Sequence, residues 1–315
     1  MWIESDIKSL HLTSHSAVAI GAFDGVHRGH QALIGRMVKE AQQRELVPLV
    51  LTFDPLPGQV LGRGEYELLT SVGERLDRIA SLGVVGTVVL PFTRELMATP
   101  ARTFVGWIRD HLALQALYAG PDFQLGRNRE GDISFLKRLG SELGYQVHRV
   151  EEMVLWNGTP IRSSRIRRAL RSGNIEEANG CLGYAYTLEG IVEHGDKRGH
   201  QLGFPTANLA ISPDRLLPAN GIYVCRAHLA TGTYEALTNV GTRPTFDRDG
   251  TTVEAYLLDF SADIYGEAMQ LEFLAYLRPE LRFDSAEALV AQMRQDEIEG
   301  RAWFAMHQTE SIGRS

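Results

Sequence analysis

Two histidines, His27 and His30, lie three residues apart at the start of a helical pattern and directly after a glycine-rich turn that begins at Gly21. Side chains at positions i and i+3 of a helix lie on the same side. The N-terminus of a helix offers free N–H groups and the positive end of its dipole, which suit a phosphate. Gly25 and Gly29 leave room for a ligand to approach the backbone. The stretch therefore predicts a phosphate-binding turn with two imidazoles; a plain turn with polar surface histidines is the alternative.

The spacing His27-x-Gly29-His30 after a strand resembles the signature of nucleotidyltransferases that move AMP from ATP to a phosphate acceptor. The tetrapeptide Phe23-Asp24-Gly25-Val26 before it is similar to the flavin-adenylating branch of that superfamily. The resemblance implies that His27 and His30 contact the triphosphate and stabilise charge in the transition state. It also implies that further residues of the turn bind the nucleotide, namely Gly21, Phe23, Asp24, Gly25 and Gly29.

A basic segment with five arginines lies between Arg162 and Arg171. Such a run is usually a solvated face, but at a helix start in an acidic protein it also suits a polyphosphate. It resembles the Ser-Ser-x-x-Ile-Arg motif that closes over the triphosphate in the same adenylyltransferases. The resemblance implies that Ser163 and Ser164 bind the nucleotide and that Arg167 stabilises its developing charge. Arg162 stands where the family usually has another serine.

Two loops of the first half complete this resemblance, each with a departure. The stretch Asp122-Phe123-Gln124-Leu125-Gly126 resembles a loop of the flavin-adenylating family, which implies binding roles for Asp122 and Phe123. A phenylalanine is commoner there than Leu125. Leu56, between two prolines, stands where many relatives carry a histidine near the nucleotide. The loss of that donor predicts slower adenylyl transfer rather than a different reaction.

The segment from Gly195 to Asn208 contains two cations between glycines, followed by Pro205. The glycines predict a mobile loop that can cover phosphates. Pro205 stiffens the chain, so that Thr206 and Asn208 point to one face of an extended segment. A hydroxyl and an amide so placed can ligate Mg²⁺. Taken alone, such a segment is more often a plain hairpin.

The run Pro205-Thr206-Ala207-Asn208 closely resembles the riboflavin kinase signature. The resemblance implies that Thr206 and Asn208 hold Mg²⁺ and phosphates. It implies that the following residues bind the ligands: Gly195, Lys197, Gly203, Pro205, Asn208, Asn239 and Arg278. Asn239 opens what looks like the family's next loop, and Arg278 belongs to the run Leu277-Arg278-Pro279-Glu280.

The run Val253–Phe260 is similar to the strand that bears the general base of riboflavin kinases, and this base falls on Glu254. Tyr256 replaces a usual histidine in the same strand. An ordinary solvent-facing strand glutamate is the alternative reading of Glu254, but the matched pattern favours the base.

Strands and helices alternate in the first half, which predicts a doubly wound α/β domain with a parallel sheet. The strands are expected at residues 17–20, 47–53, 84–92, 116–119 and 145–154. A capping box at Ser71 predicts a helix to about Leu82, and Thr99-Pro100 predicts another toward Leu114. Ligands bind beyond the carboxyl ends of such strands. The loops at residues 21–30, 54–57 and 120–126 are expected to converge there.

The second half changes to β-rich runs without helices between them, at residues 186–192, 221–227, 253–259 and 270–276. This predicts a small antiparallel β-barrel. A terminal helix at about 285–306 is expected to place Leu289, Met293 and Ile298 on one apolar stripe. The short helix at 174–183 marks the boundary, so the expected domains are residues 1–182 and 183–315.

The chain has 315 residues, 44% of them hydrophobic and 23% charged, as expected for a globular protein of two domains. The net charge of −7 argues against a general nucleic-acid or anionic-membrane binder. No run approaches a membrane span, and the acidic start has no secretory pattern. Cys181 and Cys225 match neither a metal spacing nor a disulfide framework. We expect a cytoplasmic enzyme with small-molecule substrates and no nucleic-acid or membrane partner.

The resemblance spans nearly the whole chain and is to the bifunctional bacterial riboflavin kinase/FAD synthetase family. It implies that riboflavin, ATP and Mg²⁺ give FMN, and that FMN and a second ATP give FAD and pyrophosphate. Three alternatives stay open: a kinase whose adenylyltransferase half is weakened, an adenylyltransferase for another acceptor, and a non-catalytic flavin-binding regulator. Oligomeric state and domain orientation do not follow from the sequence.

Overall fold

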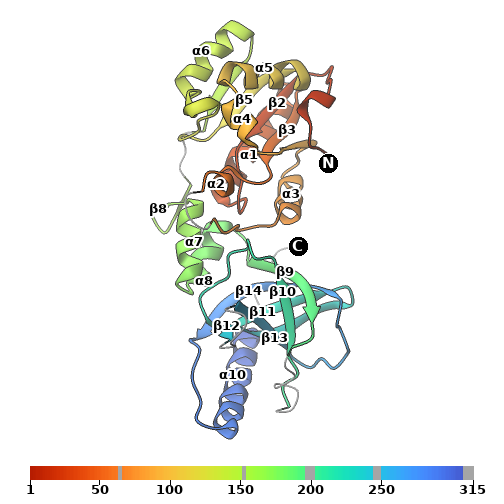
Figure 1. The fold of residues 1–315 in the computed structure, drawn as a ribbon, viewed down its shortest axis with the longest axis vertical. Coiled ribbons are helices and arrows are strands. Elements are labelled where there is room, and N and C mark those ends of the chain that lie inside the picture. The colour runs from red at the N-terminus through yellow and green to blue at the C-terminus, as the bar shows by residue number, and fades with distance from the viewer. Residues whose placement is uncertain (63–65, 151–153, 196–202, 244–249, 308–315) are drawn as a thin grey trace. The chain divides into compact units, whose positions relative to one another are not determined.

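The computed structural model describes residues 1–62, 66–150, 154–195, 203–243 and 250–307. Contacts divide the chain into two compact units (Figure 1), the parallel-sheet unit Met1–Ser163 and the barrel unit Ser164–Ser315. The helices between residues 163 and 182 fall in the barrel unit by their contacts, whereas the sequence motif groups them with the first half. The functional boundary at residues 182 and 183 therefore stays a prediction.

The parallel-sheet unit contains a six-stranded sheet whose described strands all run parallel, in the order β1-β4-β3-β2-β5-β6. The strands are β1 (Trp2–Glu4), β2 (Ser16–Ile20), β3 (Val47–Phe53), β4 (Gly86–Leu90), β5 (Leu114–Ala119) and β6 (Gln146–Arg149). This confirms the predicted doubly wound sheet. Sequence periodicity missed β1, which is too short to show alternation, and it extended β6 past Arg149.

Helices connect these strands, and their ends follow local capping chemistry. They are α1 (Arg28–Gln43), α2 (Pro57–Val60), α3 (Val72–Ser81), α4 (Arg94–Ala98), α5 (Ala101–Leu112) and α6 (Ile133–Leu143), with 3₁₀ turns η1 (Ile7–Ser9) and η2 (Arg127–Arg129) and a hairpin of β7 (Leu155–Trp156) and β8 (Thr159–Pro160). The capping box at Ser71 is confirmed. The prediction for α5 is wrong in detail, because Thr99 ends the unforeseen α4 and Pro100 is the N-cap of α5 rather than its first residue.

Alternate residues of each central strand face opposite layers of helices. Ala17 and Ala19 of β2 belong to the core under α1, whereas Val18 and Ile20 belong to the core under α5 and α6. Both faces of the sheet are therefore buried, as parallel sheets require. The apolar stripe of α1, which includes Leu33 and Met37, is buried as its helical period predicts.

The direction of the chain through the sheet reverses at β2, which has β3 on one side and β5 on the other. Such a switch point leaves a crevice outside the carboxyl ends of the two neighbouring strands. Here these ends lead into the turn at residues 21–27 and the loop at residues 120–126. The fold thus places the two predicted binding loops beside each other.

The barrel unit begins within α7 (Ser163–Arg171), at Ser164, and continues with α8 (Ile175–Leu182). Six strands follow and close into a barrel in the order β10-β13-β12-β11-β14-β9. The strands are β9 (Tyr186–Glu193), β10 (Ala207–Ile211), β11 (Gly221–Leu229), β12 (Gly232–Arg243), β13 (Gly250–Leu257) and β14 (Ala268–Arg278). The predicted antiparallel barrel is confirmed. Asn239, expected in a loop, lies within β12 instead, because that strand pairs with β13 over its whole length.

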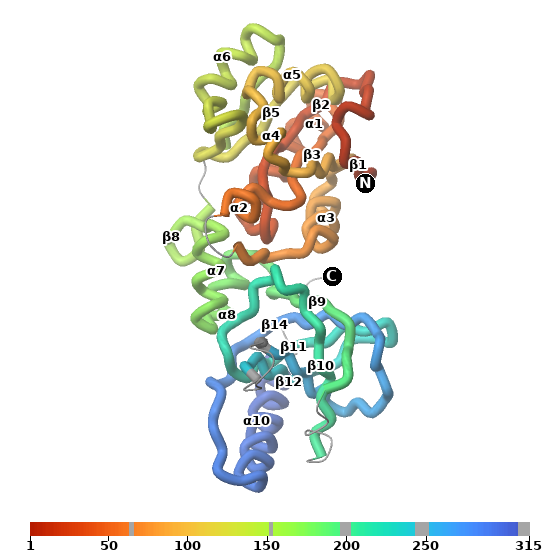
Figure 2. Tube along the Cα trace, viewed as in Figure 1, coloured from red at the N-terminus to blue at the C-terminus, as the bar shows by residue number. Residues whose placement is uncertain are grey.

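The terminal helix α10 (Ala286–His307) packs on the outside of the barrel, against β12 and β14 (Figures 1 and 2). Phe304 joins Val224 and Leu237 in a core cluster. The predicted apolar stripe is wrong at Ile298, whose exposed fraction is 63%, because the buried face of the helix runs through Asp296, Gly300 and Phe304 instead. No described helix combines the length and hydropathy that a membrane crossing requires.

Candidate active sites

The turn between β2 and α1 has an unusual backbone. Three of its residues, Phe23, Gly25 and Val26, have positive φ values of 51°, 78° and 32°. Residues with a Cβ, such as Phe23 and Val26, rarely adopt such a backbone conformation. The resulting strain is retained where the surrounding structure fixes it, often at functional sites. The turn brings His27 to the N-cap of α1.

His27 has an assignable tautomer. Its Nδ1 accepts a hydrogen bond of 3.3 Å from the backbone N–H of His30 and so caps the helix. A neutral imidazole that accepts at Nδ1 carries its proton on Nε2, which is then free to serve as a donor. Burial lowers the pKa of His27 to about 4, so the ring is neutral near pH 7.

His30 stacks on His27 with the two ring centroids 3.6 Å apart. Burial, and next the nearby His27, lower the pKa of His30 well below its usual range. Phe23 packs edge-on against His30 at 5.3 Å. Within the described part of the chain, the buried Nδ1 of His30 has no hydrogen-bond partner. An orphaned buried nitrogen costs free energy, which a bound polar ligand would recover.

Asp24 and Gly25 of this turn bond to a neighbouring segment of the chain. Asp24 is 2% exposed, and one of its carboxylate oxygens accepts bonds from the backbone N–H groups of Leu69 and Thr70 at 3.0 and 3.3 Å. The Gly25 N–H donates to the Thr70 hydroxyl at 3.1 Å. The two residues therefore anchor the turn to a neighbouring segment, and their predicted contact with the nucleotide stays a prediction.

Arg75, at the start of α3, ties the same turn to the end of β3. Its buried guanidinium donates to the carbonyl oxygen of Ala22 at 3.3 Å and to that of Phe53 at 2.8 Å. Sequence reasoning missed both Thr70 and Arg75. The capping box at Ser71 located the helix, but nothing in the local pattern shows which carbonyls a distant arginine reaches.

A cavity of about 370 Å³ opens at the switch point. It brings together predicted residues from the first turn, the β5 loop and the stretch after β8: Gly21, Phe23, His27, Gly29, His30, Asp122, Phe123 and Ser163. The Ser163 hydroxyl donates to the Asp24 carbonyl at 3.2 Å. We call this the histidine cavity.

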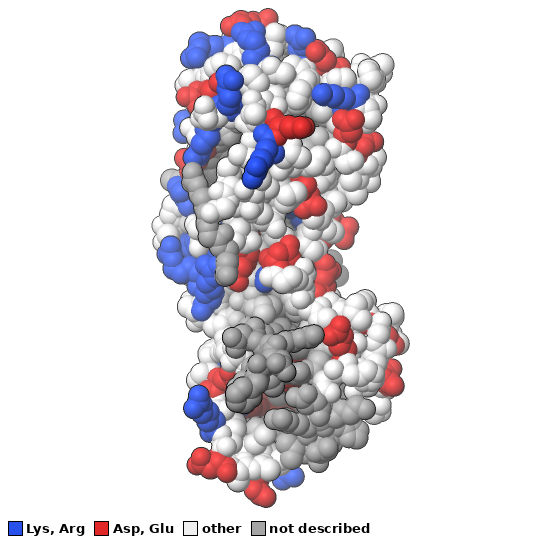
Figure 3. All heavy atoms as spheres, in the orientation of Figure 1, with Lys and Arg blue, Asp and Glu red and all other residues white. Residues whose placement is uncertain are grey.

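Ser164 and Arg167 lie in α7, within the barrel unit. Lys and Arg side chains gather on the surface over α7 (Figure 3). That Ser164 and Arg167 bind the triphosphate stays a prediction.

A second cavity of about 270 Å³ in the parallel-sheet unit is lined mainly by apolar side chains. Phe53, Phe92, Phe104 and Leu125 contribute to its lining, together with Arg129. Phe123 lines both this cavity and the histidine cavity. Phe123 is therefore shared by a cavity that contains two histidines and by an apolar one.

Leu56 lines neither cavity. Its side chain is fully buried in the core with Phe53 and Leu68. The residue precedes α2, whose Gln59 side chain accepts a bond of 2.8 Å from the Leu56 N–H. In this chain the position serves packing.

In the barrel unit, four of the predicted site residues, Asn208, Asn239, Glu254 and Arg278, lie in one row across neighbouring strands. Asn208 of β10 pairs with Glu254 of β13, and Glu254 pairs with Asn239 of β12. Ile222 of β11 pairs with Asn239 on one side and with Arg278 of β14 on the other. Directly paired residues of antiparallel strands project to the same face. The row therefore gathers residues that are up to 70 positions apart in the chain.

Asn239, Glu254 and Arg278 of this row line a cavity of about 430 Å³ on the face covered by α10, whereas Asn208 is not among its lining residues. Glu254, Asn239 and Thr206 line it together with Leu289 and Met293 of α10. We call this the glutamate cavity. The buried Oδ1 of Asn239 has no hydrogen-bond partner within the described residues, so the cavity presents a free acceptor.

Arg278 faces the helix as well as the cavity. Its guanidinium donates two bonds to Asp296 of α10, at 2.7 and 2.6 Å, and a third to the Pro279 carbonyl at 2.8 Å. Asp296 is 4% exposed and also accepts from Gln292 at 3.0 Å. Sequence reasoning missed Asp296, since an acidic residue in a helix gives no sign of burial.

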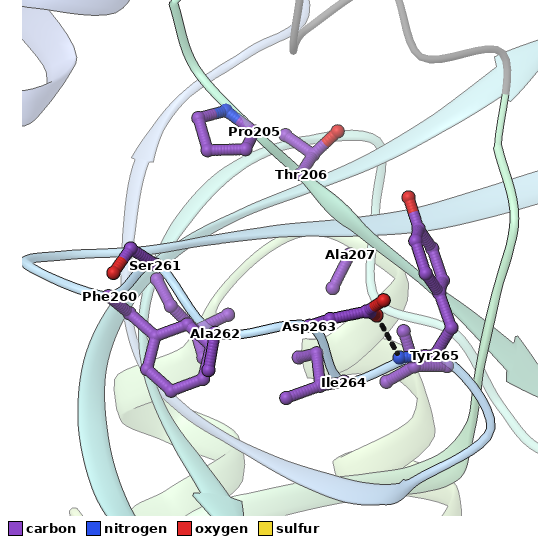
Figure 4. Close-up of a pocket in the computed structure, with 11 residues that line it drawn as sticks. Pro205, Thr206, Ala207, Phe260, Ser261, Ala262, Asp263, Ile264 and Tyr265 are labelled. Atoms are coloured by element: carbon purple, nitrogen blue, oxygen red, sulfur yellow. Dashed lines mark hydrogen bonds between the residues drawn. The ribbon is translucent and has the colours of Figure 1, made fainter.

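A further cavity of about 410 Å³ lies on the other side of Thr206. Figure 4 shows Pro205 and Thr206 along one wall and the Phe260–Tyr265 segment along the other, with the Tyr265 N–H donating to Asp263 at 3.1 Å. Thr206 thus lines two cavities, as Phe123 does in the parallel-sheet unit.

The predicted glycines at the ends of the flanking loop have clear steric reasons. A Cβ on Gly195 would lie 2.1 Å from the Asn208 amide nitrogen, and Gly203 has a φ of +87°. Lys197 lies outside the described residues.

The donors at this site fit a hard divalent cation. The Thr206 hydroxyl, the Asn208 and Asn239 amides and the Glu254 carboxylate all offer oxygen atoms, which Mg²⁺ prefers. The described residues contain no cluster of three or more His, Cys, Asp or Glu that could hold a metal by themselves. A magnesium ion here would keep waters or substrate phosphates as its remaining ligands, as Mg²⁺ commonly does.

Comparison with known proteins matches each half of the chain to one family model. A FAD synthetase family model matches residues 10–165, and a riboflavin kinase family model matches residues 182–304. A bifunctional riboflavin kinase/FMN adenylyltransferase of Listeria monocytogenes is 37% identical, over 92% of this chain and 93% of that protein. The chain belongs to the bifunctional riboflavin kinase/FMN adenylyltransferase family. The predicted resemblance is confirmed.

Two further similar proteins align with the chain over nearly their whole length. The Bacillus subtilis enzyme of the same description is 32% identical, over 95% of this chain and 99% of that protein. A crystal structure of a Streptococcus pneumoniae protein, described as a macrolide-efflux protein, superposes with a TM-score of 0.87 at 31% identity and covers 96% of this chain and 98% of that one. The two-unit architecture is therefore shared along the full chain.

Proposed function

We propose that the parallel-sheet unit transfers AMP from ATP to FMN and that the barrel unit transfers a phosphate from ATP to riboflavin. Among the described residues of each unit, two of the cavities share one residue, Phe123 in the first unit and Thr206 in the second. Group transfer requires two bound reactants that meet at one point. This paired arrangement is the observation that carries the assignment.

In adenylyl transfer, the triphosphate of ATP would lie in the histidine cavity and the flavin ring in the apolar cavity beyond Phe123. The FMN phosphate would attack the α-phosphorus, and pyrophosphate would leave. The neutral His27 ring can donate its Nε2–H to a phosphate oxygen, and the N-terminus of α1 adds backbone donors. Charge that develops on the phosphates is thereby stabilised by groups already in place.

In riboflavin phosphorylation, the flavin ring would lie in the glutamate cavity between the barrel and α10. Glu254 would accept the proton of the riboflavin 5′-hydroxyl as its oxygen attacks the γ-phosphorus of ATP, and ADP would leave. Thr206 and Asn208 would hold Mg²⁺, which supplies charge neutralisation to the phosphates. The nucleotide would lie in the cavity of Figure 4 on the other side of Thr206. Phosphoryl transfer depends chiefly on such positioning.

The test is a product assay on the full chain. Riboflavin, ATP and Mg²⁺ are supplied, and flavins are separated over time; FMN is expected first and FAD afterwards. Glu254→Gln should lower FMN formation at least about 100-fold, the usual contribution of a general base, yet still convert supplied FMN to FAD. His27→Asn should do the reverse. Equal loss of both activities in either variant would contradict one reaction per unit.

The three alternatives give different results in the same assay. FMN without FAD would indicate a weakened adenylyltransferase, FAD analogues from another acceptor would indicate different specificity, and no conversion would indicate a regulator. The cytoplasmic location and the lack of a nucleic-acid partner rest on the sequence and are part of the proposal.

A further inference from the structure

The histidine cavity has little positive charge of its own. His27 and His30 are buried and stacked, and the pKa of each is low enough to keep both rings neutral near pH 7. ATP brings about four negative charges, and its pyrophosphate group must leave as an anion. Among the described residues that line this cavity, Arg162 is the one lysine or arginine.

Arg162 is held loosely. Its Nη2 lies 3.5 Å from Asp122 Oδ2, and the two side chains are 62% and 78% exposed. An exposed ion pair of this kind contributes at most about 1 kcal/mol. A planar guanidinium can instead form two parallel hydrogen bonds to a phosphate, which are shorter and stronger. The ion pair with Asp122 therefore keeps Arg162 beside the cavity without a large cost of release.

We propose that Arg162 binds the pyrophosphate portion of ATP during adenylyl transfer and that Asp122 holds it in the free enzyme. The proposal rests on the adenylyl transfer assigned above to the histidine cavity. An oxygen of the FMN phosphate forms a bond to the α-phosphorus, while the bond from that phosphorus to the bridging oxygen breaks. The electron pair goes to pyrophosphate, and Arg162 donates N–H bonds to the oxygens that gain charge.

A serine, which the resembling motif carries at this position, could donate one hydrogen bond but no charge. Arginine therefore changes the electrostatics of this site in a way that is particular to this chain. The expected consequence is tighter binding of pyrophosphate and a lower KM for ATP than a neutral side chain would give.

The test uses the full chain and inorganic pyrophosphate as the probe. Titration calorimetry should show pyrophosphate binding about tenfold weaker in Arg162→Gln, in line with the loss of a charge-assisted hydrogen bond. Asp122→Asn should bind pyrophosphate up to about fivefold tighter, because Arg162 is released from its ion pair. Arg138→Gln is the matched control, since Arg138 is an exposed arginine of α6 outside the cavity.

Kinetics separate this proposal from the function on which it rests. Arg162→Gln should raise the KM for ATP in FAD formation and leave the riboflavin kinase rate of the barrel unit unchanged. If Arg162→Gln keeps the wild-type activity, the wild-type KM for ATP and the wild-type pyrophosphate affinity, the proposed role of Arg162 is overturned and the assigned function stands. A wild-type protein that makes no FAD from FMN and ATP would overturn the assigned function as well.

Discussion

The ion pair between Arg278 and Asp296 is expected to hold α10 over the glutamate cavity. Two hydrogen bonds of 2.7 and 2.6 Å join the side chains, which are 15% and 5% exposed. Breaking a buried pair by removing one charge costs about 3–5 kcal/mol. Asp296→Asn keeps one oxygen acceptor, so we expect a loss of about 3 kcal/mol in the free energy that holds the helix in place.

Hydrogen exchange with peptide resolution measures this loss where it occurs. A change of about 3 kcal/mol should speed exchange of the α10 amides about 100-fold. Leu289 and Met293 of α10 line the cavity, so the KM for riboflavin should rise several-fold while kcat changes little. That pattern marks lost binding rather than lost transition-state stabilisation.

Asp259→Asn is the matched control for this prediction. Asp259 accepts two bonds of 2.8 Å from Arg301 of the same helix, but this pair is exposed to solvent. The same chemical change there should have little effect on exchange, because exposed ion pairs contribute little. Equal exchange of α10 in the two variants would refute the argument that the buried pair anchors the helix.

Three further outcomes follow from the parallel-sheet unit. His27 has a pKa of about 4 in the folded protein against about 6.5 in the unfolded chain. The unfolded chain takes up the proton first as the pH falls, so His27 should lower the free energy of unfolding by about 2 kcal/mol between pH 7 and pH 5. His27→Asn, which still caps α1, should remove this part of the pH dependence, measured as the opening free energy of α1 by hydrogen exchange. Thr70→Val removes the hydroxyl that accepts the hydrogen bond from the Gly25 N–H. It should lower FAD formation but not the kinase rate, and Thr70→Ser should restore FAD formation; equal FAD formation in Thr70→Val and the wild type would contradict the anchoring role. Leu56→His places a polar ring in the core and should lower the melting temperature without faster FAD formation, whereas faster adenylyl transfer would show that the side chain reaches the site.

The sequence was most informative where the chemistry is local. The turn from Gly21 to His30 is contiguous, so its glycines, its histidines and the start of α1 could be predicted together, and the structure brings most of them to one cavity. Asp24 belongs to the same contiguous motif, yet its carboxylate turns away to Leu69 and Thr70. The direction of a side chain within a turn depends on partners 45 positions away along the chain, which no local pattern contains.

Prediction also failed where burial depends on a distant partner. The period of α10 placed Ile298 on the apolar stripe, whereas the helix buries Asp296 because Arg278 lies opposite on β14. The helical pattern predicts burial from the hydropathy of each residue alone. It therefore does not show that a charged residue can be buried where a neighbouring element neutralises its charge. Arg278 was predicted from its motif as a ligand-binding residue, and the same ion pair shows that its guanidinium also serves the packing of α10.

The charges of the two sites suit two different ways of binding a nucleotide. The barrel row presents the amides of Asn208 and Asn239 and the carboxylate of Glu254. The negative charge of Glu254 repels phosphate, and the Mg²⁺ proposed above would offset this repulsion. The histidine cavity presents N–H donors from His27 and α1 and the guanidinium of Arg162, which bind phosphate directly. Replacing Mg²⁺ with a poorer divalent cation should thus impair the kinase reaction through its protein ligands, whereas adenylyl transfer should respond only through the metal that ATP itself carries.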